Sequence, residues 1–376
     1  MRKIKKNTSK TAIKISACYM VKNEEKNLPR SLDSLKSQVD EIIVVDTGST
    51  DKTISIAESY GAKVIQTPWQ DDFSTPRNLA IDNATGDWII FLDADEYFIN
   101  TNKVRSAIKK LSSNEVIMVP LINIDVSNNN RNMGNIWSLR IFKNVKYLRY
   151  RGLIHENIAN ISGGELNYVF ANDDLTVYHT GYSTNIIKSK HLRNLSVIEK
   201  EIELIGHKPQ HDIALADCYA GLEDYEKSMQ CARRALDSEY EPVAGRGNLY
   251  HRILIAMREL KYPDADMLPV ADEAIRELPE LPEFYAERGM ILCGLDILDE
   301  AYISLHKSLE VWRKMNSNVH QESYFAAAVD KVYARLAEIE AYVGNFAQAR
   351  LNILEAIKLS PQNEEYKKLY EGWKEK

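Results

Sequence analysis

The sequence has few cysteines and no long apolar run. Only four of its 376 residues are cysteine, and they form neither a CxxC pair nor a spacing typical of zinc ligands. No stretch approaches the roughly 18 apolar residues that a membrane-spanning helix needs. The basic first ten residues are not followed by the apolar segment of a secretory signal. We therefore expect buried, reduced thiols, no membrane span and a cytoplasmic location.

Basic charge is scarce in the second half of the chain. Residues 1–205 carry 27 basic and 24 acidic side chains, a net charge of +3, whereas residues 206–376 carry 21 and 30, a net charge of −9. Phosphate backbones require a clustered basic surface, so a nucleic-acid partner is disfavoured. An acidic helical surface would suit a basic peptide, although such surfaces are more often simply solvated.

Strand and helix patterns alternate in the first half. Strands are expected at KISACYMV (14–21), EIIVVDT (41–47), KVIQTPW (63–69) and WIIFLDAD (88–95). This alternation predicts an α/β fold with a doubly wound, mostly parallel sheet. Ligands of such sheets bind at the carboxyl ends of the strands. No GxGxxG follows the first strand, which disfavours a nicotinamide-binding domain.

Three acids, Asp93, Asp95 and Glu96, follow directly on the apolar run of the fourth strand. Buried and unpaired, they would repel one another, so a metal ion is the simplest neutralising partner. Side chains at i and i+2 of a strand point the same way, which would aim Asp93 and Asp95 at one ligand. The alternative is an Asp-rich strand end that caps a helix.

From about residue 206 only helix patterns remain, and they repeat. Small or apolar residues recur with a spacing of 4 and then 3, starting at Ser228, Met267, Ala301 and Ala349, which lie 39, 34 and 48 residues apart. This pattern resembles tetratricopeptide repeats, whose basic period is 34 residues. A plain helical bundle is the alternative.

Three regions follow from these patterns. We expect an α/β domain over residues 1–184, a linking helix over 185–206, and a helical repeat domain over 207–376.

Six blocks resemble one known family. In chain order they are CYMVKNEEKNLPRSLDSL, IIVVDTGSTDKT, PWQDDFSTPRNLA, GDWIIFLDADE, GLIHE and YHTGY. Together they resemble family 2 glycosyltransferases of the GT-A fold, including bacterial members with a tetratricopeptide tail. The blocks HE, YHTGY and KSKHLRN ahead of a repeat tail are also similar to peptide S-glycosyltransferases of glycosylated-bacteriocin biosynthesis.

The resemblance implies a divalent metal site, with Mn²⁺ or Mg²⁺ stabilising the leaving diphosphate of a nucleotide-sugar donor. Asp93-Ala94-Asp95 then corresponds to the DXD motif, with Asp95 on the metal and Asp93 on the ribose or a metal-bound water. His179 matches a late histidine that completes the metal site in many GT-A relatives. A histidine merely packed at a strand end is the alternative.

The resemblance also implies a nucleotide-sugar pocket. The carboxylate of Asp46, at the end of the second strand, can accept the N3–H of a uracil. Arg77 offers a charged fork to the diphosphate or to Asp95. The other positions expected to line this pocket are Asn23, Glu24, Thr47, Asn78 and Asp93.

The HE block supplies the candidate base of an inverting transfer. Glu156 is the first choice and His155 the second. If the acceptor is a thiol, with a pKa of about 8.5, little base assistance is needed, and Glu156 would merely position the peptide.

The resulting hypothesis is an inverting glycosyltransferase that moves a sugar from a nucleotide-diphosphate donor, preferably a UDP-sugar, to a Cys or Ser side chain of a peptide or protein. One alternative acceptor is a cell-surface polysaccharide or a lipid-linked sugar. A second alternative is a non-catalytic scaffold that senses nucleotide and binds peptide. Repeat tails often pair subunits, so a homodimer is a further expected assembly.

Overall fold

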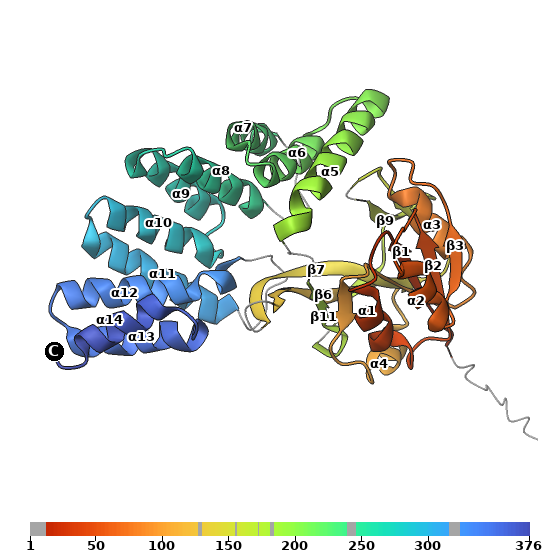
Figure 1. Ribbon diagram of the computed structural model, residues 1–376. Coiled ribbons are helices and arrows are strands. Elements are labelled where there is room, and N and C mark those ends of the chain that lie inside the picture. Colours follow the sequence, from red (N-terminus) through yellow and green to blue (C-terminus); the bar gives the residue numbers. More distant parts are fainter. Residues whose placement is uncertain are drawn as a thin grey trace, which may run out of the picture. The chain divides into compact units, whose positions relative to one another are not determined.

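The computed structural model describes residues 13–126, 130–154, 156–171, 173–180, 184–238, 246–315 and 324–376. The chain forms two compact units (Figure 1). The first comprises Met1–Leu121 and Trp137–Gly181, and the second comprises Ile122–Ile136 and Tyr182–Lys376. Among the described residues, no helix has the length and apolar character needed to cross a membrane.

A large sheet forms the centre of the first unit. Its strands lie in the order β3-β2-β1-β4-β7-β6-β11-β5, and β10 pairs with β6. The strands are β1 (Ile15–Val21), β2 (Glu41–Asp46), β3 (Lys63–Gln66), β4 (Trp88–Leu92), β5 (Glu96–Phe98), β6 (Val116–Asp125), β7 (Arg131–Lys143), β10 (Tyr168–Phe170) and β11 (Val177–His179).

The first four strands are parallel, since β1 pairs in parallel with β2 and β4, and β2 with β3. β4 and β7 run antiparallel, as do β5 and β11. The continuous apolar runs of β1 and β4 are almost wholly buried, as expected for strands covered on both faces. The predicted fold class is confirmed.

Four helices accompany this sheet: α1 (Leu28–Leu35), α2 (Thr53–Ser59), α3 (Ser74–Asp82) and α4 (Val104–Leu111). α3 packs on β1 and β2, and α1 on β5. A separate antiparallel ribbon, β8 (Leu148–Arg151) with β9 (Asn157–Asn160), lies against α3 through β8. A short 3₁₀ helix, η2 (Asp173–Leu175), precedes β11.

β4 is shorter than predicted. It ends at Leu92, and Asp93 begins a turn in which the amide of Glu96 donates to the Asp93 carbonyl over 3.0 Å. The expected strand through Asp95 is therefore wrong, and the alternation of side chains along a strand does not apply to Asp93 and Asp95. Asp93 and Asp95 belong to the loop between β4 and β5, and Glu96 is the first residue of β5.

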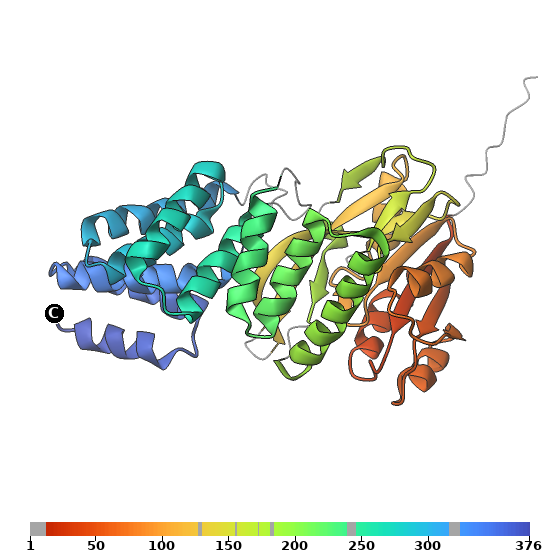
Figure 2. The same cartoon turned by 90° about the horizontal axis from the view of Figure 1, so that it is seen from above.

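The second unit consists mainly of helices that stack in sequence order (Figure 2). They are α5 (Thr184–Ile205), α6 (Pro209–Gly221), α7 (Tyr225–Leu236), α8 (Gly247–Glu259), α9 (Asp264–Glu277), α10 (Pro282–Gly294), α11 (Leu298–Met315), the 3₁₀ helix η3 (Phe325–Ala327), α12 (Val329–Tyr342), α13 (Phe346–Leu359) and α14 (Glu364–Trp373).

The four predicted repeat anchors occupy equivalent places in this stack. Ser228, Met267, Ala301 and Ala349 are each the fourth residue of the second helix of a pair, in α7, α9, α11 and α13. All four side chains are buried, with at most 2% of their surface exposed. The tetratricopeptide-type repeat inferred from their spacing is confirmed, because each anchor packs its helix onto a partner at the same point.

The tight turns inside the helix pairs also repeat. Each contains one residue in the left-handed region, with φ of 62° at Glu223, 59° at Lys261, 58° at Asp296 and 83° at Gly344. Each of these residues follows the C-cap of the first helix, the position where such a conformation ends a helix.

The segment Ile122–Ile136 belongs to the second unit, although the strands β6 and β7 that run into it continue into the sheet. Its Arg131 donates to Asp330 Oδ1 over 2.6 Å, to the Ala327 carbonyl over 2.7 Å and to Ser360 Oγ over 3.0 Å. Asp330 is 3% exposed, so this is a buried ion pair.

The four cysteines are free thiols, as expected. Cys18, Cys218 and Cys231 are buried and Cys293 is partly buried.

Candidate active site

Charged side chains from several elements meet just beyond the carboxyl end of β4. We call Arg77, Asp93, Glu96, Arg140 and Glu156 the carboxylate–arginine cluster. Arg77 comes from α3, Asp93 from the loop after β4, Glu96 from β5, Arg140 from β7, and Glu156 from the loop before β9. The cluster lies at the edge of the sheet where ligands of such folds bind.

Arg77 is the most enclosed member, with 6% of its surface exposed. Its Nη2 lies 2.8 Å from Asp93 Oδ1. Its Nε lies 2.5 Å from Glu156 Oε1, an ion pair by distance that is not aligned as a hydrogen bond. The guanidinium also faces the rings of Phe91 and Tyr150, with its central carbon 4.8 and 5.3 Å from their centroids. Its Nη1 has no hydrogen-bond partner among the described residues, which leaves a buried donor for an anionic ligand.

Arg140 was not predicted from the sequence. Its Nε and Nη2 bind the two carboxylate oxygens of Glu96 over 2.8 and 2.6 Å, and Nη2 also reaches Asp93 Oδ2 at 3.2 Å. It reaches these acids because Ile141 of β7 lies opposite Ile90 of β4, which places Arg140 near the end of β4. Neither β7 nor its register was predicted, so no signal in the sequence pointed to this arginine.

The two arginines and the burial of the site set the charge states. Burial would raise the pKa of Asp93, but the charges of Arg77 and Arg140 outweigh it and hold that pKa well below its usual range. Burial raises the pKa of Glu96, against the opposing charge of Arg140. The pKa of Arg77 is raised by Asp93 and Glu156, against the effect of burial, so the guanidinium stays charged.

Asp95 and His179 form a second group beside the cluster. His179 Nε2 lies 3.4 Å from Asp95 Oδ2. The antiparallel register of β5 and β11 brings them together, because it places His179 opposite Glu96. Thr180 donates from both its amide and its hydroxyl to the Asp95 carbonyl over 3.1 Å, and Arg30 donates to the Thr180 hydroxyl over 2.6 Å.

The predicted metal ligands are only partly assembled. Within the described ranges, no three His, Cys, Asp or Glu side chains are arranged as a metal site. Asp93 faces Arg77 and Arg140, while Asp95 and His179 lie together. A carboxylate and an imidazole are an acceptable pair of ligands for Mn²⁺, provided that other ligands come from water or a bound substrate.

The electrostatic field at this pair favours a cation. Burial alone would lower the pKa of His179, but its hydrogen bond to Asp95 and the charges of Asp95, Glu96 and Asp93 raise it. Among the described residues, the carboxylates of Asp93, Glu96 and Glu156 pair with the two guanidinium groups of Arg77 and Arg140, and that of Asp95 lies by His179. The residues present therefore fit a divalent ion.

The predicted nucleotide-binding residues of β1 and β2 lie on two adjoining loops. Asp46 Oδ1 accepts from the amides of Gly48 and Ser49, both over 3.0 Å, so this carboxylate shapes the turn after β2. Asn23, with φ of 57°, accepts at Oδ1 from the Thr50 amide over 2.7 Å.

The neighbouring predicted residues fasten the same loops. Glu24 donates its amide to the Thr53 hydroxyl over 2.7 Å, and Thr47 donates its amide to the Val21 carbonyl over 3.0 Å. The structure thus brings Asn23, Glu24, Asp46 and Thr47 together at the carboxyl ends of β1 and β2.

Asn78 links α3 to the strand β8 through two hydrogen bonds. Its amide donates to the Tyr150 carbonyl over 3.0 Å and accepts from the Tyr150 amide over 2.9 Å. At the start of the same helix, Ser74 Oγ donates to the Gly152 carbonyl over 2.6 Å and the Phe73 amide to the Leu153 carbonyl over 2.9 Å. These bonds hold the segment after β8 on α3 and so place Glu156 beside Arg77. His155 lies outside the described residues.

Comparison with known proteins identifies the family. Residues 16–167 match the model of glycosyl transferase family 2. A TPR repeat-containing protein of Synechococcus elongatus is 31% identical over 76% of this chain and 74% of its own length. The SPbeta prophage-derived glycosyltransferase SunS of Bacillus subtilis is 31% identical over 52% of this chain and 47% of its own. The chain therefore belongs to the family 2 glycosyltransferases in which a GT-A domain is joined to tetratricopeptide-type helices.

A solved structure, that of glucosyl-3-phosphoglycerate synthase from Mycobacterium tuberculosis in complex with Mn²⁺, UDP and phosphoglyceric acid, is 24% identical over 29% of this chain and 43% of its own. The TM-score is 0.26.

Proposed function

We propose that this family 2 enzyme transfers a sugar from a nucleotide-diphosphate donor, preferably a UDP-sugar, to a Cys or Ser side chain of a peptide or protein, with inversion at the anomeric carbon. The observation that carries the donor half of the proposal is the arrangement beyond β4. A buried arginine with an unpartnered N–H lies beside a carboxylate–imidazole pair whose surroundings favour a cation. A diphosphate with its divalent ion presents the two complementary charges.

In this proposal, Asp95 and His179 hold Mn²⁺ or Mg²⁺, and Asp93 binds the ribose or a metal-bound water. The ion, when bound, supplies charge stabilisation to the departing diphosphate. Arg77 donates Nη1 to a diphosphate oxygen. Asp46, Asn23, Glu24 and Thr47 line the nucleoside part of the pocket, and Asn78 positions the segment that carries Glu156.

The transfer forms a bond between the acceptor sulfur or oxygen and the anomeric carbon, as the bond from that carbon to the diphosphate oxygen breaks. The acceptor proton passes to the Glu156 carboxylate, and the nucleoside diphosphate leaves. The ion pair with Arg77 holds the Glu156 carboxylate in place until the acceptor arrives. A thiol acceptor would need this base less than a hydroxyl would.

A peptide acceptor is supported by the second unit, whose helix pairs stack as a tetratricopeptide-type array. Polysaccharide or lipid-linked acceptors lack a comparable counterpart among the described features.

The test is thermal stability of the full chain with UDP, GDP or CDP, each with Mn²⁺ or with EDTA. Nucleotide at about 100 times its dissociation constant should stabilise the fold by about 2.7 kcal/mol. We expect the shift with UDP and Mn²⁺, and we expect Asp95→Asn to abolish it. Asp33→Asn, an exposed acid of α1 paired with Lys36, is the matched control. If no nucleotide shifts the melting temperature of the wild type, the donor proposal fails.

A further inference from the structure

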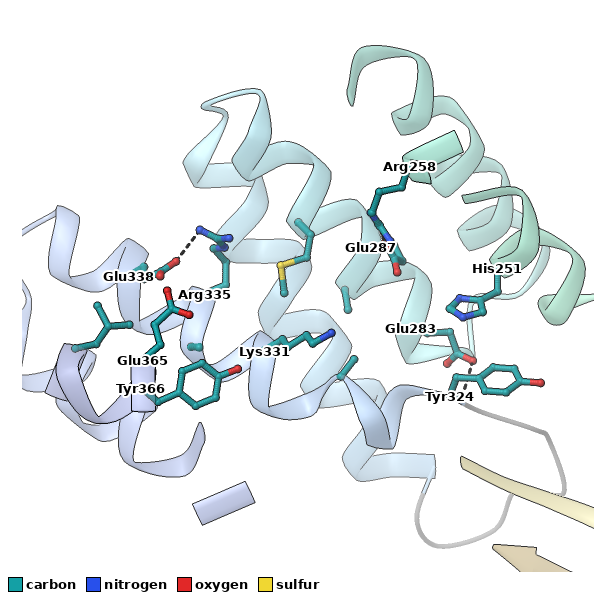
Figure 3. A pocket seen from close by; sticks show the side chains of 15 residues that line it. His251, Arg258, Glu283, Glu287, Tyr324, Lys331, Arg335, Glu338, Glu365 and Tyr366 are labelled. Atoms are coloured by element: carbon teal, nitrogen blue, oxygen red, sulfur yellow. Dashed lines mark hydrogen bonds and ion pairs between the residues drawn. The ribbon is translucent and has the colours of Figure 1, made fainter. Parts of the chain in front are cut away.

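The inner side of the helical array contains a cavity of about 440 Å³ (Figure 3). Most of its lining comes from the first helices of successive pairs, α8, α10 and α12, and from the terminal helix α14. Regular stacking aligns these first helices, so the cavity results from the repeat itself. It lies wholly within the second unit.

The cavity combines an apolar floor with charged walls. Met290, Leu369 and the ring of Tyr366 supply apolar surface, and Tyr366 is 8% exposed. The walls carry three cations, Arg258, Lys331 and Arg335, and four carboxylates, Glu283, Glu287, Glu338 and Glu365. His251 also lines the wall, and burial lowers its pKa to about 4, so it is neutral at pH 7.

Ion pairs within the cavity wall neutralise only some of these charged side chains. Arg258 pairs with Glu287, and Arg335 pairs with Glu338 over 2.6 Å. No basic side chain of the described chain pairs with Glu365. Figure 3 shows Glu365 pointing toward the Arg335–Glu338 pair, so a second carboxylate lies near one guanidinium that is already paired. Two like charges around a single cation leave room for a second one.

We propose that this cavity binds a lysine or arginine side chain of the acceptor peptide, with Glu365 and Glu338 taking the charged head and Met290, Leu369 and Tyr366 contacting the aliphatic stem. This inference rests on the peptide-acceptor half of the proposed function. A long basic side chain fits because it presents an apolar stem below a charged end. The net charge of −9 over residues 206–376 also attracts a basic segment.

The test uses fluorescence anisotropy of the full chain with a fluorescein-labelled octapeptide of alternating glycine and lysine, at low salt. Glu365→Gln should weaken binding by up to about fivefold, the upper end of what one exposed ion pair contributes. Glu364→Gln is the matched control, since it removes the same charge from the same turn of α14 but does not line the cavity. It should change the affinity less than twofold. Lys331→Gln should tighten binding, because it removes a like charge from the wall.

Equal effects of Glu365→Gln and Glu364→Gln would overturn the proposal, because binding would then follow net charge alone. No binding of the lysine octapeptide, or equal binding of its glutamate counterpart, would also overturn it. The nucleotide-dependent thermal shift is measured on the same samples. A normal shift without lysine-dependent binding would refute this pocket and leave the donor proposal standing.

Discussion

The two units differ in how far apart along the chain their key residues lie. In the first, the carboxylate–arginine cluster joins five elements, and its ion pairs link residues 16 to 79 positions apart along the chain, as in Arg77–Asp93 and Arg77–Glu156. In the second, the structure repeats locally, and the same anchor position recurs in α7, α9, α11 and α13. The comparison teaches that the chemistry depends on distant strand register, whereas the scaffold depends on short-range periodicity.

The largest effect is expected from Arg77→Met. This change leaves Asp93 and Glu156 without their shared cation in an enclosed site, and breaking a buried pair in this way costs about 3–5 kcal/mol. Urea unfolding monitored by circular dichroism measures the loss. Sugar transfer should fall even under conditions where the variant is fully folded.

Two variants sharpen this result. Arg77→Lys should recover only part of the stability, because an ammonium cannot reproduce the fork that reaches both acids. Lys36→Met, which breaks an exposed pair with Asp33, should leave the urea midpoint unchanged. An Arg77→Met variant as stable as wild type would show that Arg77 does not stabilise the buried charges of Asp93 and Glu156.

The second prediction concerns Arg131, where the helical unit also relies on a distant pair. Among the described residues, Arg131→Met leaves Asp330, which is 3% exposed, with only the hydroxyls of Ser360 and Tyr366 as partners, at 2.7 and 3.3 Å. We expect a loss of about 3 kcal/mol in urea unfolding. Adding Asp330→Asn to Arg131→Met should restore part of it, since no unpaired charge then remains. If the double variant is less stable than Arg131→Met, the buried charge is not the cause.

The sequence was informative where periodicity is local. The apolar runs of β1, β2 and β4, the acids after β4 and the four repeat anchors could all be predicted. Arg140 and the pairing of β5 with β11 could not be predicted. Strands of three residues, such as β5 and β11, are too short to show a periodic pattern. The register between strands that are distant in the chain also cannot be deduced from the sequence of either strand. The ion pair between Arg131 and Asp330, which lie 199 residues apart, could not be predicted for the same reason.

The third prediction uses His251, a partly buried histidine of the helical unit. His251 stacks on Tyr324, with ring centroids 5.3 Å apart, and burial lowers its pKa to about 4. In the unfolded chain its pKa is about 6.5, so the unfolded state takes up the proton first as pH falls. Its contribution to stability is present above pH 6.5 and is lost toward pH 4, by about 2 kcal/mol at pH 5.

The measurement compares urea midpoints at pH 7 and pH 5 for wild type and His251→Phe, which keeps an aromatic ring against Tyr324. Other histidines titrate in both proteins, so the difference between the two isolates His251. The prediction fails if both proteins lose the same stability between these pH values.

The smallest effect is expected at the repeat turns, where the sequence pattern is most regular. Asp296 has φ of 58°, in the left-handed region that costs a residue with a Cβ roughly 1 kcal/mol, and the equivalent position after α12 is Gly344. Asp296→Gly should therefore raise stability by about 0.5–1 kcal/mol, whereas Gly344→Ala should lower it by a similar amount. Differential scanning calorimetry of the two variants checks both signs. If both changes move the melting temperature in the same direction, the turns are not equivalent and the repeat is less regular than its anchors indicate.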